Sequence, residues 1–175
     1  GMLLGKGRKN ALKLGVSKNI FSFPHLPSAF DGFKVLHLSD LHLDMNDSLT
    51  GVLTQTLEKL DYDVCVMTGD YRAKTFGPID RALEQLHTVK KVLRGEVYAI
   101  LGNHDSIRMV PGMEALGIRM LMNESVALER GDDLLHIAGI DDPHYYRVDN
   151  IEKAGDEIPP EDVSLLLAHS PEVFM

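Results

Sequence analysis

The sequence predicts an α/β protein built on a parallel β-sheet, and two observations support this fold class. Short apolar runs at residues 33–38, 64–67 and 97–101 alternate with two stretches whose apolar residues recur at helical spacing. This strand–helix–strand order is typical of βαβ units, which form parallel sheets. Each apolar run also ends in polar side chains that can bind metal. Because open α/β sheets place their active sites at the carboxyl ends of the strands, we expect the functional residues at that edge.

Length and composition predict a soluble protein with one sizeable core. The chain has 175 residues, of which 44% are hydrophobic and 25% charged, as is ordinary for a globular domain. Its net charge of −8 argues against non-specific binding to nucleic acid, so we expect no nucleic-acid partner. Cys65 is the only cysteine, which excludes an intrachain disulfide and any need for an oxidising compartment. We expect a cytoplasmic protein, with association at a membrane as the alternative.

Residues 1–30 are expected to form a basic arm and residues 31–175 the domain. The arm holds five basic side chains and no acidic one, with apolar residues interspersed. A solvated arm that packs a few apolar residues against the domain is the favoured interpretation. The alternative is an amphipathic segment that makes peripheral contact with a membrane surface. Pro24 and Pro27 mark a connector in which a helix is not expected to continue.

The first half of the domain is expected to supply three strands and two helices. Residues 33–38, 64–67 and 97–101 are apolar enough for buried strands. Residues 48–60 and 78–93 carry apolar side chains on one helical stripe, and each stretch connects two of the strands.

The pattern changes in the second half of the domain. Residues 108–116 are expected to form a short helix, and residues 124–140 a hairpin around Gly131-Asp132-Asp133. A last apolar run, residues 163–168, is expected to form a strand that leads directly into His169.

The side chains at the strand ends are a set of metal ligands. Asp40 and His42 alternate and therefore point to the same side, while Asp70, Asn103 and His169 follow later strands. A mixed set of carboxylate, amide and imidazole suits Mn, Fe or Zn better than Ca or Mg. A structural zinc needs four ligands in a closed shell, so this larger set fits a two-metal site better. Taken alone, Asp40 could be a helix N-cap and His169 a core histidine, but the recurrence at successive strand ends favours metal.

These residues occur in segments that resemble a known family. Asp40-Leu41-His42, Gly69-Asp70, Gly102-Asn103-His104-Asp105 and Ala168-His169 resemble, in order and spacing, the sequence boxes of the calcineurin-like metallophosphoesterases. The resemblance spans roughly residues 33–170. It implies a four-layer αββα sandwich of mixed sheets flanked by helices, with a binuclear metal centre between the sheets. It also implies hydrolysis of a phosphomonoester, phosphodiester or pyrophosphate bond by a hydroxide activated by two divalent cations.

The resemblance further implies a role for each metal ligand. Asp40 and His42 would bind the first metal, Asp70 would bridge the two metals, and Asn103 and His169 would bind the second.

Four more residues are candidates for catalysis or substrate binding. His104 would stabilise the phosphoryl transition state and protonate the leaving oxygen, a role that suits an imidazole near neutral pH. Asp105 resembles the partner that orients His104. His144 and Arg72 are candidates for contact with the substrate phosphate, with an ordinary solvated loop position as the alternative for both.

The sequence departs from the family pattern at its end. The family normally closes with a Gly-His-x-His box, whereas this sequence stops at Met175, six residues beyond His169. We expect a longer protein to complete the sandwich, which is otherwise incomplete at the C-terminus and lacks a cover on one side.

The flanking sequences are similar to a bacterial branch of the family, and two alternatives to that assignment are open. Members of the branch are often membrane-associated, and some cleave UDP-diacylglucosamine, so a lipid-linked phosphoester is one substrate class and a small molecule the other. A non-catalytic protein-binding scaffold on the same fold is the first alternative, which the intact boxes disfavour. A soluble nucleotide or cyclic-nucleotide phosphodiesterase is the second. The sequence does not indicate an oligomeric state.

Overall fold

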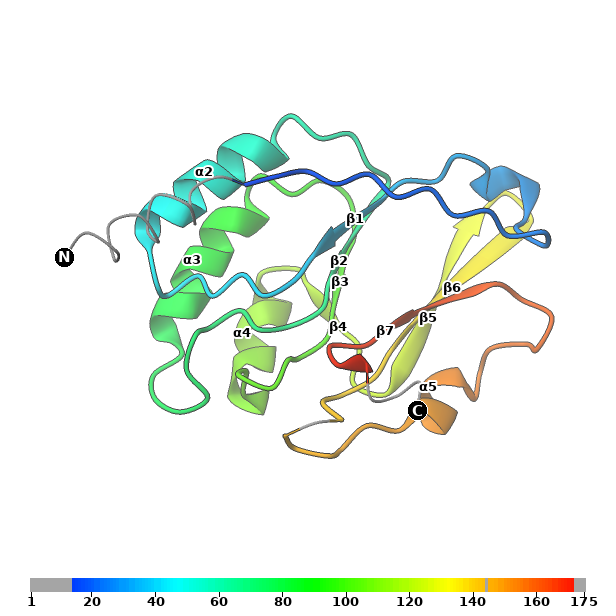
Figure 1. The fold of residues 1–175 in the computed structure, drawn as a ribbon. Coiled ribbons are helices and arrows are strands. Elements are labelled where there is room, and N and C mark those ends of the chain that lie inside the picture. Colours follow the sequence, from blue (N-terminus) through cyan, green and yellow to red (C-terminus); the bar gives the residue numbers. More distant parts are fainter. Residues whose placement is uncertain (1–13, 144, 172–175) are drawn as a thin grey trace.

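The structure, a computed structural model, describes residues 14–143 and 145–171. Two β-sheets lie face to face, one with four strands and one with three. Helices cover the outer face of each sheet, so that the layers run helices, sheet, sheet, helix (Figure 1). This arrangement confirms the expected four-layer αββα sandwich.

The larger sheet is parallel throughout and has the strand order β1-β2-β3-β4. Its strands and the helices between them follow the chain in the expected alternation. They are β1 (Val35–Leu38), α2 (Asp47–Leu57), β2 (Val64–Met67), α3 (Asp80–Lys90), β3 (Val97–Ala99), η2 (Ile107–Met109), α4 (Val110–Ala115) and β4 (Arg119–Met120).

The smaller sheet has mixed strand directions. Strands β5 (Glu124–Arg130) and β6 (Asp133–Gly139) form the expected antiparallel hairpin, and β7 (Ser164–Leu167) pairs with β6 in parallel. Two short elements flank this sheet, the 3₁₀ helix η1 (Ser28–Phe30) and the helix α5 (Ile151–Gly155).

Strand β2 contributes side chains to two hydrophobic cores, one on each face of the sheet. All four of its residues are buried, and they alternate between the two faces of the sheet. Cys65 and Met67 pack in the core between the larger sheet and the helices α2, α3 and α4. Val64 and Val66 pack on the opposite side, in the core between the two sheets. A continuous apolar run is therefore what a central strand of a sandwich requires.

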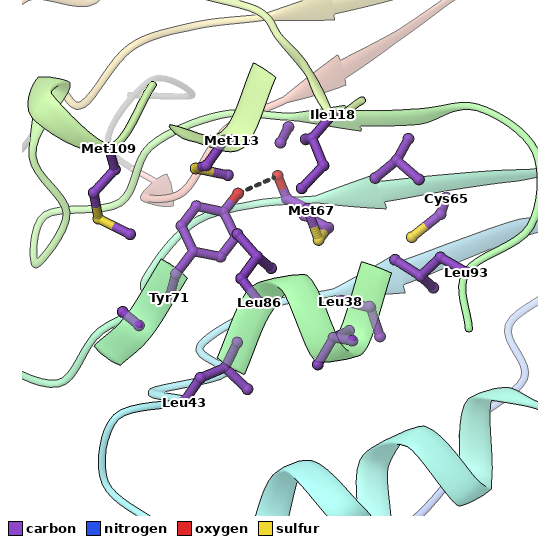
Figure 2. Close-up of a cluster of buried hydrophobic side chains, with 14 of the residues drawn as sticks. Leu38, Leu43, Cys65, Met67, Tyr71, Leu86, Leu93, Met109, Met113 and Ile118 are labelled. Carbon is purple, nitrogen blue, oxygen red and sulfur yellow. Dashed lines mark hydrogen bonds between the residues drawn. The ribbon is translucent and has the colours of Figure 1, made fainter. Parts of the chain in front are cut away.

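Figure 2 shows the core on the helical side of the larger sheet, where Tyr71 is enclosed among aliphatic and methionine side chains. Its single hydroxyl hydrogen is shared between the carbonyl oxygens of Ile100 (2.7 Å) and Met67 (3.2 Å), with Ile100 the closer acceptor. Burial raises the pKa of this phenol well above its usual range. Tyr71, which directly follows Asp70, is thus anchored to the ends of the neighbouring strands β2 and β3.

The structure differs from the expected elements in several places. The expected helix over residues 108–116 is divided into η2 and α4, and β3 ends before Ile100. Strand β4 and helix α5 were not expected, because two and five residues are too short to show a period. Among the described residues, no helix has the length and apolar content that crossing a membrane requires.

The basic arm is described only in part. Residues 1–13 lie outside the described residues, and residues 14–27 contain no helix or strand. Phe30, at the end of the predicted arm, is fully buried between the two sheets. The predicted boundary after residue 30, and the predicted membrane contact of the arm, stay predictions.

Candidate metal centre

The candidate site lies where the loops after β1, β2, β3 and β7 meet at one end of the sandwich. Backbone hydrogen bonds join the first two loops. The Asp40 amide donates to the Gly69 carbonyl (3.1 Å), and the His42 amide donates to the Asp70 carbonyl (3.0 Å). The strand ends are therefore held together by the main chain before any side chain contributes.

Asp40, His42 and Asp70 come together as a group that could hold a metal ion. One donor atom from each residue lies within 4.8 Å of the others. All three residues have a positive φ, of 53°, 41° and 57° respectively. This left-handed conformation is uncommon for residues other than glycine, and it accumulates at functional sites. Sequence spacing placed Asp40 and His42 on one side of an extended strand, but β1 ends at Leu38 and both residues lie in the loop that follows it.

The carboxylate of Asp70 faces two sets of donors. It is only 4% exposed. Its Oδ2 lies 3.9 Å from Nε2 of His42, and its Oδ1 lies 3.6 Å from Nε2 of His169. Asp70 therefore lies between the group on the β1 loop and the group formed by Asn103 and His169.

Three imidazole rings are oriented by backbone carbonyl groups. Nδ1 of His42 bonds to the carbonyl of Arg72 (2.9 Å), and Nδ1 of His104 bonds to that of Ala73 (2.8 Å). Nδ1 of His169 bonds to the carbonyl of Thr68 (2.7 Å). A carbonyl oxygen can only accept, so each Nδ1 carries the hydrogen and each Nε2 faces the site. This is the orientation in which a histidine ligates a metal through Nε2.

Asn103 and His169 meet through their side chains next to Asp70. Nε2 of His169 lies 2.9 Å from Oδ1 of Asn103. With a neutral ring whose Nδ1 holds the hydrogen, both atoms present lone pairs to each other. A cation shared between them removes this conflict, and Oδ1 of Asp70 lies on the same side to share it. The residues present thus fit a second metal beside the first.

Two glycines allow the loops to approach this closely. A Cβ atom at Gly102 would lie 2.4 Å from Oδ1 of Asp70 and 3.0 Å from Cε1 of His169. A Cβ atom at Gly69, whose φ is +95°, would lie 2.3 Å from the backbone nitrogen of Gly102. Neither position has room for a side chain, which explains why glycine precedes the ligand in both loops.

Asp105 has a different partner from the one expected. We expected it to orient His104, but the His104 ring is held by the Ala73 carbonyl. The Asp105 carboxylate, fully buried, instead accepts N–H groups from Asp70 (2.7 Å), Tyr71 (2.9 Å) and Gly102 (2.8 Å). Burial raises the pKa of this carboxyl group to about 6, against the effect of its hydrogen bonds. Asp105 therefore joins two ligand loops through their backbones.

Arg72 also differs from the expectation. We considered it as a contact for the substrate phosphate, but it is 3% exposed, and its guanidinium group is used inside the protein. It donates hydrogen bonds to the carbonyl oxygens of His104 (2.6 Å), Gly77 (3.2 Å) and Thr75. The second expected phosphate contact, His144, lies outside the described residues.

Several groups that support the site could not be predicted from the sequence. The carbonyl groups of Thr68, Arg72 and Ala73 orient the histidines, and no side-chain pattern reveals a backbone acceptor. Asp44 accepts the N–H of Ala73 (2.8 Å) and so positions the carbonyl that holds His104.

Comparison with known proteins identifies the family. Residues 33–173 match the model of the calcineurin-like phosphoesterase family. The chain is 28% identical over 151 residues to the uncharacterized metallophosphoesterase YkoQ of Bacillus subtilis (strain 168), covering 81% of this chain and 54% of that protein. It is 30% identical over 162 residues to a transmembrane protein with metallophosphoesterase domain of Danio rerio, covering 83% of this chain and 37% of that protein. The chain thus spans about half or less of the length of these relatives.

A solved structure supports the fold independently of sequence. The NAD nucleotidase NadN of Haemophilus influenzae superimposes with a TM-score of 0.55 at 15% sequence identity, covering 81% of this chain and 35% of that one. The four-layer sandwich, the ligand residues gathered at the strand ends and the match over residues 33–173 agree with one another. The chain belongs to the calcineurin-like phosphoesterase family.

Proposed function

We propose that this chain belongs to a metal-dependent enzyme that hydrolyses phosphoester bonds with two divalent cations. One observation carries the proposal: the two oxygen atoms of the Asp70 carboxylate face separate groups of donors. A carboxylate in that position can bridge two ions. Metals roughly 3.5 to 4 Å apart are the arrangement that phosphoester hydrolysis uses.

In this proposal the donors divide into two sets around Asp70. Asp40, His42 and Asp70 would hold one cation, and one donor atom from each of them lies within 4.8 Å of the others. Asn103 and His169 would hold the other cation beside Asp70. The mixed donor set favours Mn, Fe or Zn. When bound, the pair of cations neutralises charge on the phosphoryl group and lowers the pKa of the attacking water.

His104 is the proposed catalytic acid. Its ring meets that of His42 edge to face, with centroids 5.6 Å apart, so it stands next to the candidate centre. Its Nδ1 is engaged by Ala73, which leaves Nε2 to hold a proton for the leaving oxygen. The backbone of His104 is held as well as its ring, because its amide donates a hydrogen bond to Oδ1 of Asp70 (2.9 Å).

The test combines metal content with hydrolysis of an aryl phosphomonoester and an aryl phosphodiester in the presence of Mn. We expect the protein to bind about two equivalents of metal and to hydrolyse at least one of the two esters. His104→Asn should keep the metal and lose most turnover, by about 10²-fold or more. His87→Asn, at an exposed position on α3, is the matched control and should behave as the unchanged protein. Full activity of His104→Asn would remove this residue from the mechanism, and metal binding without hydrolysis would favour the scaffold alternative.

A further inference from the structure

Three exposed aromatic side chains form a cluster beside the candidate centre. Phe76 is 76% exposed, Tyr145 48% and Tyr146 42%. The rings of Phe76 and Tyr145 meet at 71° with centroids 6.4 Å apart, and those of Tyr145 and Tyr146 at 82° and 4.9 Å. We call these three residues the aromatic corner. Contiguous exposed apolar surface often marks a binding site.

The aromatic corner lies next to the residue that we propose as the acid. The hydroxyl group of Tyr146 donates to the backbone carbonyl of Asp105 (2.9 Å), directly after His104. On the other side, Phe76 belongs to the loop that begins after β2, in which Ala73 holds the ring of His104. The two segments that carry the corner therefore both contact the His104 loop.

Both segments are fixed in place from within the protein. Arg72 bonds to the carbonyl groups of Thr75 and Gly77, on either side of Phe76. Asp142, which is fully buried, accepts the backbone N–H groups of Tyr145 and Tyr146, both at 2.6 Å. The rings are thus presented by ordered loops, so that little conformational entropy would be lost on binding.

We propose that the aromatic corner binds a planar aromatic group on the alcohol that leaves during hydrolysis. This inference rests on the proposed function, which puts the leaving oxygen at His104. Phe76 and Tyr145 keep much of their surface exposed, at 76% and 48%, and an exposed aromatic ring can stack on planar groups of many kinds. The hydroxyl group of Tyr145 makes the corner partly polar, because that of Tyr146 is already bonded to Asp105, and a partly polar corner suits a nucleobase-like ring better than an acyl chain. The substrate class is therefore a phosphoester with an aromatic alcohol component.

The test measures binding without turnover. The Mn-loaded chain is titrated calorimetrically with 2-phenylethylphosphonate, 2-cyclohexylethylphosphonate and propylphosphonate, whose carbon–phosphorus bonds are not hydrolysed. We expect the phenyl compound to bind about tenfold more tightly than the propyl compound, with the cyclohexyl compound closer to the propyl one. Phe76→Ala and Tyr145→Ala should lose most of this preference, whereas Tyr145→Phe should keep it. Phe21→Ala is the matched control, because Phe21 is 74% exposed and does not belong to the corner.

Several results would overturn the inference. Equal affinities for the phenyl and propyl compounds, an unchanged preference in both alanine variants, or no binding of any phosphonate would each do so. Equal affinities for the phenyl and cyclohexyl compounds would exclude stacking in favour of a general apolar contact.

Hydrolysis of 2-phenylethyl phosphate and propyl phosphate, measured in parallel, separates the two proposals. Turnover of both esters with equal kcat/KM refutes the aromatic subsite and leaves the proposed function intact. No turnover of either ester refutes the proposed function, while the phosphonate titrations still decide whether the corner prefers an aromatic group.

Discussion

Replacing Gly102 by alanine should destabilise the candidate metal centre, because the added methyl group would clash with the loop that carries Asp70. The added Cβ atom would lie 2.4 Å from Oδ1 of Asp70, 2.5 Å from its backbone nitrogen and 3.0 Å from Cε1 of His169. The carboxylate oxygen can turn away, but the backbone nitrogen can move only with its loop. Overpacking of this kind typically costs 1–3 kcal/mol, and a rigid neighbour puts the cost at about 3 kcal/mol in the free energy of unfolding.

The loss of metal affinity follows from the same contacts. Turning Asp70 away from the added methyl group displaces the oxygen that faces His169. Disturbing the groups that support a metal ligand typically weakens metal binding by 10- to 100-fold. We therefore expect Gly102→Ala to bind Mn about 10- to 100-fold more weakly than the unchanged protein.

Two measurements check this prediction. Urea unfolding in the presence of EDTA gives the stability without metal, and calorimetric titration with Mn gives the affinity. Gly51→Ala is the matched control: Gly51 lies inside α2 with open space around it, and alanine there should stabilise the protein by about 0.5–1 kcal/mol. A Gly102→Ala protein with unchanged stability and unchanged Mn affinity would refute the assigned packing of the loops.

Three further predictions concern other positions in the larger sheet and the loops that follow its strands. Gly69→Ala should lower the free energy of unfolding by more than Gly102→Ala, because the three atoms nearest its Cβ are all backbone, at 2.3–2.8 Å, and its φ is +95°. Soluble expression and urea unfolding measure this loss. A loss smaller than that of Gly102→Ala would contradict the prediction. Tyr71→Phe should lower the free energy of unfolding by about 1 kcal/mol, because the carbonyl of Ile100 loses its 2.7 Å donor. A loss below about 0.3 kcal/mol would show that this bond contributes little to stability. Burial raises the pKa of Cys65 to about 12, so its thiolate form is scarce at pH 8. A disulfide reagent should therefore label Cys65 only after unfolding. Rapid labelling of the folded protein would show that the thiol is not buried.

The sequence predicted three of the four strands of the larger sheet because each leaves an apolar run, and β2 and β3 are buried along their whole length. The runs that became β1, β2 and β3 are apolar and end in polar residues, and both features can be read from side chains alone. The β5–β6 hairpin was predicted in the same way, from two apolar stretches around a turn. Strand β4 and helix α5 are held by their surroundings and not by a local pattern.

The candidate site was predicted to the extent that side chains define it. Asp40, His42 and Asp70 were predicted as ligands and lie together, and Asn103 and His169 lie in contact with each other. Arg72 and Asp105 were assigned to the wrong partners, because each bonds to backbone groups. Arg72 donates to carbonyl groups and Asp105 accepts from N–H groups, and neither kind of partner has a sequence signature. Charged residues near a catalytic motif therefore need the folded backbone before a role can be given to them.

The left-handed backbone at three ligand positions lowers the folding stability of the protein while it places side chains that can bind an ion. Asp40, His42 and Asp70 hold φ angles of 53°, 41° and 57°, where a glycine would relieve a cost on the order of 1 kcal/mol each. A glycine would also remove the donor atom. A laboratory search for heat-tolerant variants that scored folding alone would therefore favour changes at these positions, and would deplete the centre while it improved the scaffold.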